Sequence, residues 1–264
     1  MDYVIIFRRY RNAEPEIGMI DNFDLTKLII PLQEWFKMNA RVLPWREHPT
    51  AYYVWVSEIM LQQTRVEAVK PYFDRFIKEL PDVKALAGCQ EDKLLKLWEG
   101  LGYYNRVRNL NIAAKQIIEG YDGVIPSDYE ELLKLKGIGH YTAGAIASIA
   151  YGKPVPAVDG NVLRVISRVT ADDSDIMKQS VKTHMEEKLR DIMVRFAEAD
   201  TTTSSQQAKV KKGNDDTGIR LVPSIFNQAL MELGATVCVP NGAPYCEICP
   251  WQEFCEARRQ NRIE

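Results

Sequence analysis

Apolar residues recur every three to four positions along most of this chain, which is the period of amphipathic α-helices. The pattern predicts helices over residues 66–80, 91–101 and 105–121. Signals for β-strands, such as runs of alternating apolar and polar residues, are few. The chain is therefore predicted to be an all-α protein.

Some of the predicted helices have recognisable ends. Asp24 is a predicted N-cap for a helix over residues 25–39, in which Pro31 implies a kink or a late start. Thr50 is predicted to cap the apolar run that contains residues 54–61.

Two segments lack this periodicity. Residues 200–220 are polar and rich in small side chains, and we interpret them as a disordered insertion. Residues 1–22 are interpreted as an N-terminal tail, whose apolar residues precede its arginines, the reverse of a secretory signal. No apolar run is long enough for a membrane span, so we expect a cytoplasmic, nucleoid-associated protein.

A third segment predicts two helices joined by a tight turn. Ser127 and Glu130 form a predicted capping box before the first helix, and residues 140–150 form the second. The turn consists of Gly137, Ile138 and Gly139. Glycines leave backbone amides uncovered, so a helix–hairpin–helix over residues 127–152 could bind a DNA phosphate, with a cation on its carbonyls. The alternative is an ordinary helical turn with a glycine C-cap.

The overall charge neither supports nor excludes a nucleic-acid partner. The chain of 264 residues has a formal net charge of −2. Neutralising phosphates requires Lys and Arg, so this balance argues mildly against such a partner. Contacts from backbone amides need almost no side-chain charge, which weakens the objection.

Four cysteines lie close together near the C-terminus. They are Cys238, Cys246, Cys249 and Cys255, separated by seven, two and five residues. A Cys-x-x-Cys pair can place two thiolates on one metal centre, and the outer cysteines complete a four-sulfur set. A disulfide is disfavoured because no secretory signal precedes the cluster. The spacing favours an iron–sulfur cluster over zinc only modestly, since zinc ribbons usually carry two such pairs.

Two carboxylates suggest a chemical role. Glu58 lies in the apolar segment YYVWVSEIML, where burial would raise its pKa and make it a general acid at neutral pH. Alternatively, its carboxyl group reaches solvent or an arginine such as Arg46. Asp159 can cap the next helix and still face a site. A protonated carboxyl group paired with a carboxylate can break a glycosidic bond.

Several motifs, taken in order, resemble those of the adenine DNA glycosylases of the MutY family. They are LPWR (43–46), VWVSEIMLQQTRV (54–66), EGLGYYNRVRNL (99–110), LKGIGHYTAGAIASIAYG (135–152), VDGNVLRV (158–165) and FNQALMELGATVC (226–238). With the cysteines, the resemblance extends over roughly residues 23–255.

The resemblance implies the fold of the helix–hairpin–helix glycosylases, with the active site between two domains. Residues 47–158 would form a six-helix barrel that carries the hairpin. Residues 23–46 and 159–264 would form a helical domain in which the four cysteines bind a 4Fe–4S cluster of structural function.

The resemblance also implies catalytic roles. Glu58 would protonate the adenine leaving group, Asp159 would face the anomeric carbon, and Tyr141 would lie between them. Asn161 and Arg46 match supporting polar residues. Endonuclease III-type enzymes have a lysine amine at the position of Tyr141, so we expect base excision with little or no strand cleavage.

A second group of matching residues would contact the substrate. Gln228 resembles the residue that reads the flipped base. Gln63 and Tyr103 resemble side chains that wedge into the duplex where the base leaves. The same motifs place Gln62 and Trp45 among the DNA-contacting residues.

The chain also departs from the family pattern. The loop between Cys238 and Cys246 is one residue longer than usual and contains no Lys or Arg. The chain ends at Glu264, whereas the usual member continues into a domain that recognises 8-oxoguanine, and we expect that domain to be absent. The barrel face alone or a separate protein would then sense the opposite base, or the preference would be weak.

The leading hypothesis is a monomeric adenine DNA glycosylase acting on duplexes with adenine opposite 8-oxoguanine or guanine. One alternative is a mismatch thymine or uracil glycosylase of the same superfamily. The other is a non-catalytic iron–sulfur protein that binds DNA. Glu58 and Gln228 favour adenine, because an acid directed at a purine nitrogen suits the departure of a purine.

Overall fold

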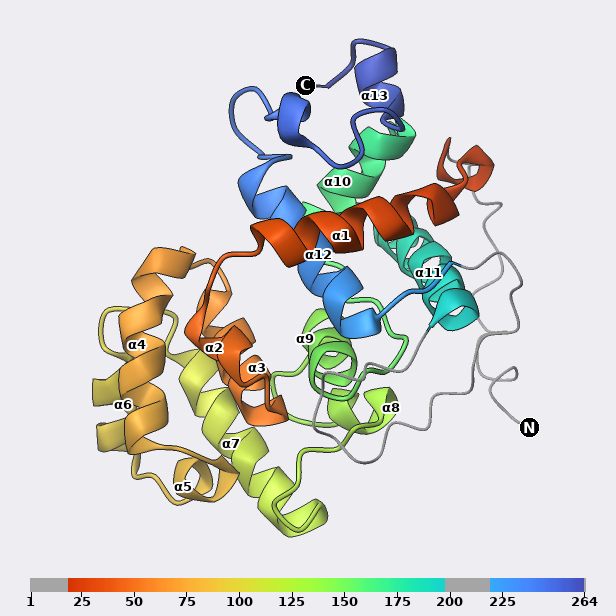
Figure 1. Ribbon diagram of the computed structural model, residues 1–264. Coiled ribbons are helices and arrows are strands. Elements are labelled where there is room, and N and C mark those ends of the chain that lie inside the picture. Colours follow the sequence, from red (N-terminus) through yellow and green to blue (C-terminus); the bar gives the residue numbers. More distant parts are fainter. Residues whose placement is uncertain (1–18, 198–218, 264) are drawn as a thin grey trace, which may run out of the picture.

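The computed structural model describes residues 19–197 and 219–263, which fold into helices (Figure 1). Within these ranges the β pairing is one isolated bridge between Ala197 and Leu221, so the predicted all-α class is confirmed. The predicted insertion and tail fall largely on residues 198–218 and 1–18, outside the described residues. No helix in the described ranges combines the length and apolar character needed to cross a membrane.

The first group of helices shares a core of buried side chains between residues 43 and 157. It comprises α2 (Pro44–Glu47), α3 (Ala51–Leu61), α4 (Val66–Glu79), α5 (Val83–Ala87), α6 (Glu91–Trp98), α7 (Asn105–Gly120), α8 (Tyr129–Leu133), α9 (His140–Ala145) and a π-helical turn, η4 (Ile146–Ala150).

The second group combines both ends of the described chain around a core from residues 20–36 and 162–251. It comprises η2 (Met19–Asn22), η3 (Leu25–Leu28), α1 (Ile29–Asn39), α10 (Gly160–Thr170), α11 (Gln179–Phe196), α12 (Pro223–Thr236), η5 (Cys246–Ile248) and α13 (Glu256–Arg259).

Local signals set several helix ends as predicted. Asp24 caps η3, and α1 begins only at Ile29, which confirms the late start predicted from Pro31. Thr50 caps α3, where its side chain accepts a hydrogen bond from the amide of Tyr53.

The predicted capping box at Ser127 and Glu130 is wrong. The N-cap of α8 is Asp128, whose carboxylate accepts hydrogen bonds from the amides of Glu130 and Glu131. Aspartate is as good an N-cap residue as serine. In addition, its negative charge interacts favourably with the positive, N-terminal end of the helix dipole.

The turn between α8 and α9 confirms the predicted hairpin. Gly137 has a φ of +79°, and a Cβ atom there would lie 2.8 Å from the Cβ atom of Asn109 on α7. The position therefore needs glycine both for its backbone angle and for close packing. Ile138 is buried in the first core, and Gly139 is the N-cap of α9.

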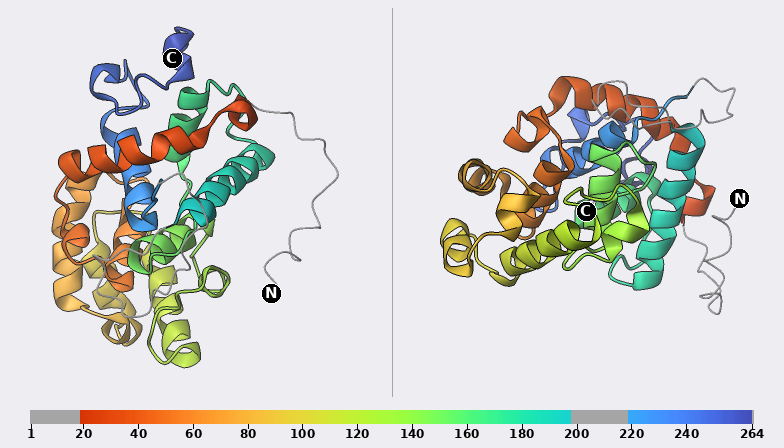
Figure 2. Two further views of the ribbon diagram at one scale, coloured as in Figure 1. Left: turned by 45° about the vertical axis from the view of Figure 1, so that its right-hand side comes forward. Right: turned by 90° about the horizontal axis from the view of Figure 1, so that it is seen from below.

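Helix α12 links the two groups. It contacts α1 and α10 in the second group and η4 in the first, and the left view of Figure 2 shows it (blue) running from α1 toward the green helices of the first group. Gly234 lets α10 approach closely, because a Cβ atom there would lie 2.8 Å from that of Asn161. Met231 on α12 packs against both cores.

Candidate active site

A cavity of about 880 Å³ lies where α3, α9, α10 and α12 meet. Ten of the predicted site residues line it: Trp45, Arg46, Glu58, Gln62, Gln63, Tyr103, Tyr141, Asp159, Asn161 and Gln228. The fold thus brings together residues from segments far apart in the sequence. The turn residues Gly137, Ile138 and Gly139 and the four cysteines lie outside this cavity.

Glu58 is buried on the cavity wall, with 7% of its surface exposed. Its Oε2 accepts a hydrogen bond of 2.6 Å from the hydroxyl group of Tyr141. Burial raises the pKa of Glu58 to about 7; the nearby Asp159 adds to this, while Tyr141 and the charge of Arg46 oppose it. A carboxyl group with this pKa can hold a proton near neutral pH and can therefore act as a general acid.

Tyr141 stays a neutral donor in this site. Burial, together with the nearby Glu58 and Asp159, raises the pKa of its hydroxyl group well above the usual range. The hydroxyl group also lies 3.6 Å from the sulfur of Met231 on α12.

Asp159 combines the two roles considered for it. Its Oδ1 accepts a hydrogen bond of 2.8 Å from the amide of Val162, so it caps α10. Its Oδ2 accepts a hydrogen bond of 2.7 Å from the side-chain amide of Asn161. Arg164 donates to the Asn161 carbonyl oxygen and to the backbone oxygen of Gly234. Because the side-chain oxygen Oδ1 of Asn161 accepts this hydrogen bond from Arg164, the side-chain NH₂ group of Asn161 is oriented toward Asp159.

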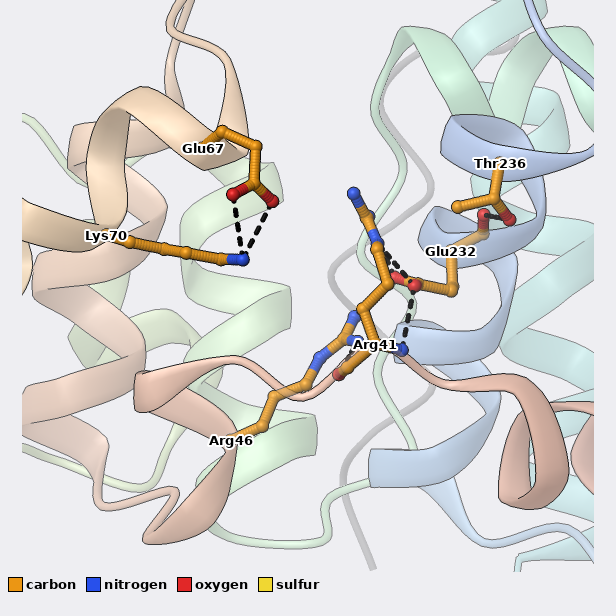
Figure 3. Close-up of polar contacts among 6 residues, drawn as sticks. All are labelled: Arg41, Arg46, Glu67, Lys70, Glu232 and Thr236. Carbon is orange, nitrogen blue, oxygen red and sulfur yellow. Dashed lines mark hydrogen bonds and ion pairs between the residues drawn. The ribbon is translucent and has the colours of Figure 1, made fainter.

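A second buried glutamate, which the sequence reasoning missed, lines the same cavity. Glu232 on α12 has 1% of its surface exposed. Its Oε1 accepts from Nε of Arg41 at 2.6 Å, and its Oε2 accepts from the guanidinium groups of Arg41 at 3.0 Å and Arg46 at 2.9 Å (Figure 3). Burial alone would raise the pKa of Glu232, but the two arginines hold it below the usual range. The available signal was its spacing of four residues from Gln228, which places both on one helix face.

This network changes the interpretation of Arg46. Its guanidinium group bonds to Glu232 and to the backbone oxygen of Arg41, and it lies 5.2 Å from the centre of the Phe36 ring. Glu58 therefore neither reaches solvent nor forms an ion pair with Arg46, as the alternative had suggested; Arg46 acts on it only through its charge.

The remaining predicted contact residues surround the cavity. Gln228 donates a side-chain hydrogen bond of 3.1 Å to the backbone oxygen of Ser224 on its own helix. Gln63 and Tyr103 adopt left-handed backbone angles, with φ of 57° and 48°. The side chain of Tyr103 is 67% exposed. Trp45, in contrast, is buried and forms an edge-to-face contact with the ring of Phe73.

The four cysteines lie together beside α10. Cys238 follows α12, Cys246 begins η5, and Cys255 is the N-cap of α13, which packs on α10. Burial raises the pKa of the Cys249 thiol to about 12, and the other three thiols add to this shift, so the four are close enough to interact. Among the described residues, no three Cys, His, Asp or Glu side chains meet as closely as one metal ion would require.

Two arginines of α10 face the first cysteine. Arg168 donates to the sulfur of Cys238 at 3.4 Å and to the backbone oxygen of Val239. Arg164 donates to the backbone oxygen of Cys238 at 3.1 Å. The helix that Asp159 caps therefore also contacts the cysteine segment.

Comparison with known proteins gives a consistent result. Residues 56–191 match the family described as "HhH-GPD superfamily base excision DNA repair protein". The chain is 37% identical to the adenine DNA glycosylase of Rattus norvegicus over 249 residues, and 38% identical to that of Homo sapiens over 238 residues. It is 36% identical over 231 residues to the adenine DNA glycosylase of Buchnera aphidicola (subsp. Acyrthosiphon pisum).

These alignments cover 91%, 87% and 87% of this chain, but 43%, 39% and 59% of the respective relatives. The chain thus spans about half the length of the curated relatives it matches.

Two solved structures share the fold. A thermostable thymine-DNA glycosylase superposes with a TM-score of 0.68 at 23% identity, covering 90% of this chain and 100% of that one. Endonuclease III in a non-covalent DNA complex superposes with a TM-score of 0.65 at 21% identity, covering 92% and 100%. The predicted helix–hairpin–helix glycosylase fold is confirmed.

Proposed function

This chain belongs to the HhH-GPD superfamily of base excision DNA repair proteins, and we propose that it is a monofunctional adenine DNA glycosylase. One arrangement supports this proposal most directly. A carboxyl group with a pKa of about 7, Glu58, accepts a hydrogen bond from the neutral Tyr141, and Asp159 lines the same cavity. The similarity to adenine DNA glycosylases favours adenine as the base.

In the proposed reaction, Glu58 donates its proton to a ring nitrogen of the departing adenine. The N-glycosidic bond then breaks, its electron pair leaves with the base, and positive charge develops on the sugar. Asp159 stabilises that charge, and Asn161 holds the orientation of Asp159 through its side-chain amide. Water completes the hydrolysis. The adenine must first leave the base stack, because the glycosidic bond is shielded inside the duplex.

The same cavity favours base removal without strand cleavage. None of the described residues that line it is a lysine, and Tyr141 occupies the position where a lysine nucleophile was considered. The phenol of Tyr141 has no amine nitrogen, so it cannot form the Schiff base through which a lysine promotes β-elimination. The product would be an abasic site that alkali cleaves.

DNA contact is proposed for two surfaces. The glycine turn before α9 would place backbone amides on a phosphate, with a cation on its carbonyls. Tyr103 and Gln63, at the rim of the cavity, would enter the space that the flipped adenine leaves, while Gln228 reads the base. The opposite base would be 8-oxoguanine or guanine.

We further propose that the four cysteines hold a 4Fe–4S cluster. Their chemistry fits: the thiols of the other three cysteines raise the pKa of Cys249, so the four lie within interacting distance, and Arg164 and Arg168 donate hydrogen bonds to Cys238. A bound cluster would crosslink the end of α12, which Cys238 follows, to the C-terminal segment that carries the other three cysteines. Its role would be structural, since four protein ligands leave no open iron position.

The cluster proposal is tested by comparing Cys246→Ser with Cys89→Ser, a cysteine of the first group that lies outside the four. Purified protein should be brown and contain iron and sulfide. Cys246→Ser should lose the colour and much of the solubility, whereas Cys89→Ser should keep both. A colourless, zinc-containing and active preparation would refute the cluster.

The enzymatic proposal is tested by single-turnover assays on duplexes with A opposite 8-oxoguanine, A opposite G, T opposite G and U opposite G. Each duplex is treated with and without alkali. Cleavage of the adenine strand that requires alkali supports a monofunctional adenine glycosylase. Cleavage confined to T or U strands would replace it with the thymine or uracil activity, and cleavage of none would favour a non-catalytic DNA-binding role.

A further inference from the structure

We propose that Arg106 is a positioning residue that locks the two duplex-inserting turns into one rigid unit. This inference rests on the proposed glycosylase function and deepens it. The two turns are the end of α3, which carries Gln62 and Gln63, and the turn from Leu101 to Tyr103 before α7.

The two turns come from separate segments and have unusual backbones. Gln63 and Tyr103, the side chains proposed to enter the duplex, are two of the five described non-glycine residues with positive φ. Residues other than glycine rarely adopt these backbone angles, so contacts with surrounding residues must hold Gln63 and Tyr103 in this conformation. Tyr103 is 67% exposed and cannot be held by burial alone.

Arg106 supplies those contacts by bonding to both turns at once. One terminal nitrogen of its guanidinium group donates to backbone oxygens at the end of α3, those of Ile59 at 2.9 Å, Met60 at 3.1 Å and Gln62 at 2.6 Å. The other donates to backbone oxygens of the second turn, those of Leu101 at 3.0 Å and Gly102 at 3.2 Å. One planar group therefore sets the spacing between the two turns.

The surroundings of Arg106 suit this role. Its guanidinium carbon lies 5.5 Å from the ring centres of both Trp98 and Tyr103, so its charge also attracts the face of the exposed Tyr103 ring. Among the described residues no carboxylate pairs with it, and burial lowers its pKa. The carbonyl groups at the C-terminal end of α3 stabilise its charge.

Arg106 also connects the two turns to the hairpin. It lines a small cavity of about 40 Å³ together with Gln62, Asn109 and Gly137. Gly137 is the hairpin glycine that packs against Asn109 on α7, the helix that carries Arg106. The residue therefore lies between the proposed phosphate-binding turn and the inserting side chains.

Arg106 also lines the active-site cavity, but its hydrogen bonds separate its role from the chemistry. Its hydrogen bonds go to the two turns and not to Glu58, Tyr141 or Asp159. Loss of Arg106 should therefore slow the extrusion of adenine from the duplex and leave the cleavage of an adenine that is already extrahelical largely intact. Lysine should not replace it, because one ammonium group cannot bond to two turns at once.

The experiment compares Arg106→Gln and Arg106→Lys with Arg108→Gln. Arg108 lies two residues further along α7, where it forms an exposed ion pair with Glu91. Two quantities are measured for each protein: the fluorescence rise of 2-aminopurine on extrusion from a duplex, and single-turnover excision of adenine from a paired duplex and from a single-nucleotide bulge. Melting temperatures identify variants that fail to fold.

Both Arg106 variants should reduce extrusion and paired-duplex excision by about 10- to 100-fold, because extrusion opposes a stacking energy of a few kcal/mol. Excision from the bulge should change by less than about threefold, and Arg108→Gln should match the wild type throughout. Combining Arg106→Lys with Gln63→Ala should add little further loss of extrusion.

An equal loss on both substrates, or wild-type extrusion by Arg106→Lys, would overturn the proposal. Failure of the glycosylase function itself is a separate result: the wild-type protein would then excise adenine from neither substrate, and the extrusion signal alone would still report on Arg106.

Discussion

Two glutamates are buried on different walls of one cavity, yet their protonation is predicted to be opposite. Glu58 on α3 accepts one hydrogen bond from the neutral Tyr141, and its pKa rises to about 7. Glu232 on α12 accepts from Arg41 and Arg46, and its pKa falls below the usual range. Their exposed fractions are 7% and 1%. Burial is thus similar, and the partners decide which glutamate keeps its proton.

The comparison also explains how an arginine can lie near the proposed acid. The charge of Arg46 lowers the pKa of Glu58, but Arg46 donates its hydrogen bond to Glu232. We infer that Glu232 neutralises part of that charge and so keeps Glu58 protonated near neutral pH. Arg41, Asp159 and Tyr141 are further charged or titratable groups that line the same cavity.

The largest effect is expected from replacing the acid itself. Glu58→Gln retains the shape of the side chain but has no proton to donate, so single-turnover excision should fall by about 10²- to 10⁴-fold. DNA binding, measured by fluorescence anisotropy, should change little. Glu119→Gln, an exposed position on α7, is the matched control. Unchanged excision by Glu58→Gln would remove the acid role.

The same substitution should also remove a pH dependence of stability that Glu58 causes. Between about pH 4.5 and 7 the folded chain retains a proton on Glu58 that the unfolded chain has released, so stability falls as pH rises through this window. The free energy of unfolding of Glu58→Gln relative to wild type should therefore rise by about 2–3 kcal/mol from pH 5 to pH 8. Urea unfolding at the two pH values measures it, and a difference independent of pH would contradict the raised pKa.

An intermediate effect is expected from Glu232→Gln. Two arginines would lose their buried counter-charge, which should lower the free energy of unfolding by about 2 kcal/mol, less than for a fully buried pair because Arg41 is 35% exposed. The uncompensated Arg46 should favour ionised Glu58, so the alkaline limb of excision should move to lower pH.

Glu67→Gln is the control for this variant, because Glu67 forms an exposed ion pair with Lys70 on α4 (Figure 3). It should change stability by less than about 0.5 kcal/mol and leave the pH profile in place. A Glu232→Gln protein with wild-type stability and pH profile would show that Glu232 does not balance the charge of Arg46.

The smallest effect is expected from Tyr141→Phe. The hydroxyl group of Tyr141 donates to Glu58 and stabilises its ionised form, so removing it should raise the pKa of Glu58. The alkaline limb of the pH–rate profile should move upward by about one unit. Tyr151→Phe removes a hydrogen bond to the backbone oxygen of Ile125 and should not move the limb. A downward shift for Tyr141→Phe would contradict this account.

The helices were predictable wherever the signal was local. The late start of α1 and the capping of α3 by Thr50 follow from residues within one turn of each helix end. The capping box failed because Ser127 and Asp128 are both good caps, and their order in the sequence does not show which has the extended backbone. The π-helical turn η4 was also missed, because its bonding differs from that of an α-helix by only one residue.

The sequence by itself determined the all-α class, the hairpin turn, the cysteine spacing and the presence of one carboxyl group, Glu58, in an apolar segment. Each of these features depends on residue types and on spacings over a few positions, and both are properties of the sequence whatever the fold. The tertiary structure alone decided that Tyr141, not Arg46, bonds to Glu58, and that Arg46 bonds to Glu232, 186 positions away. Such partners are set by how α3, α9 and α12 pack around the cavity, because a hydrogen bond acts over about 3 Å of space and is independent of distance along the chain.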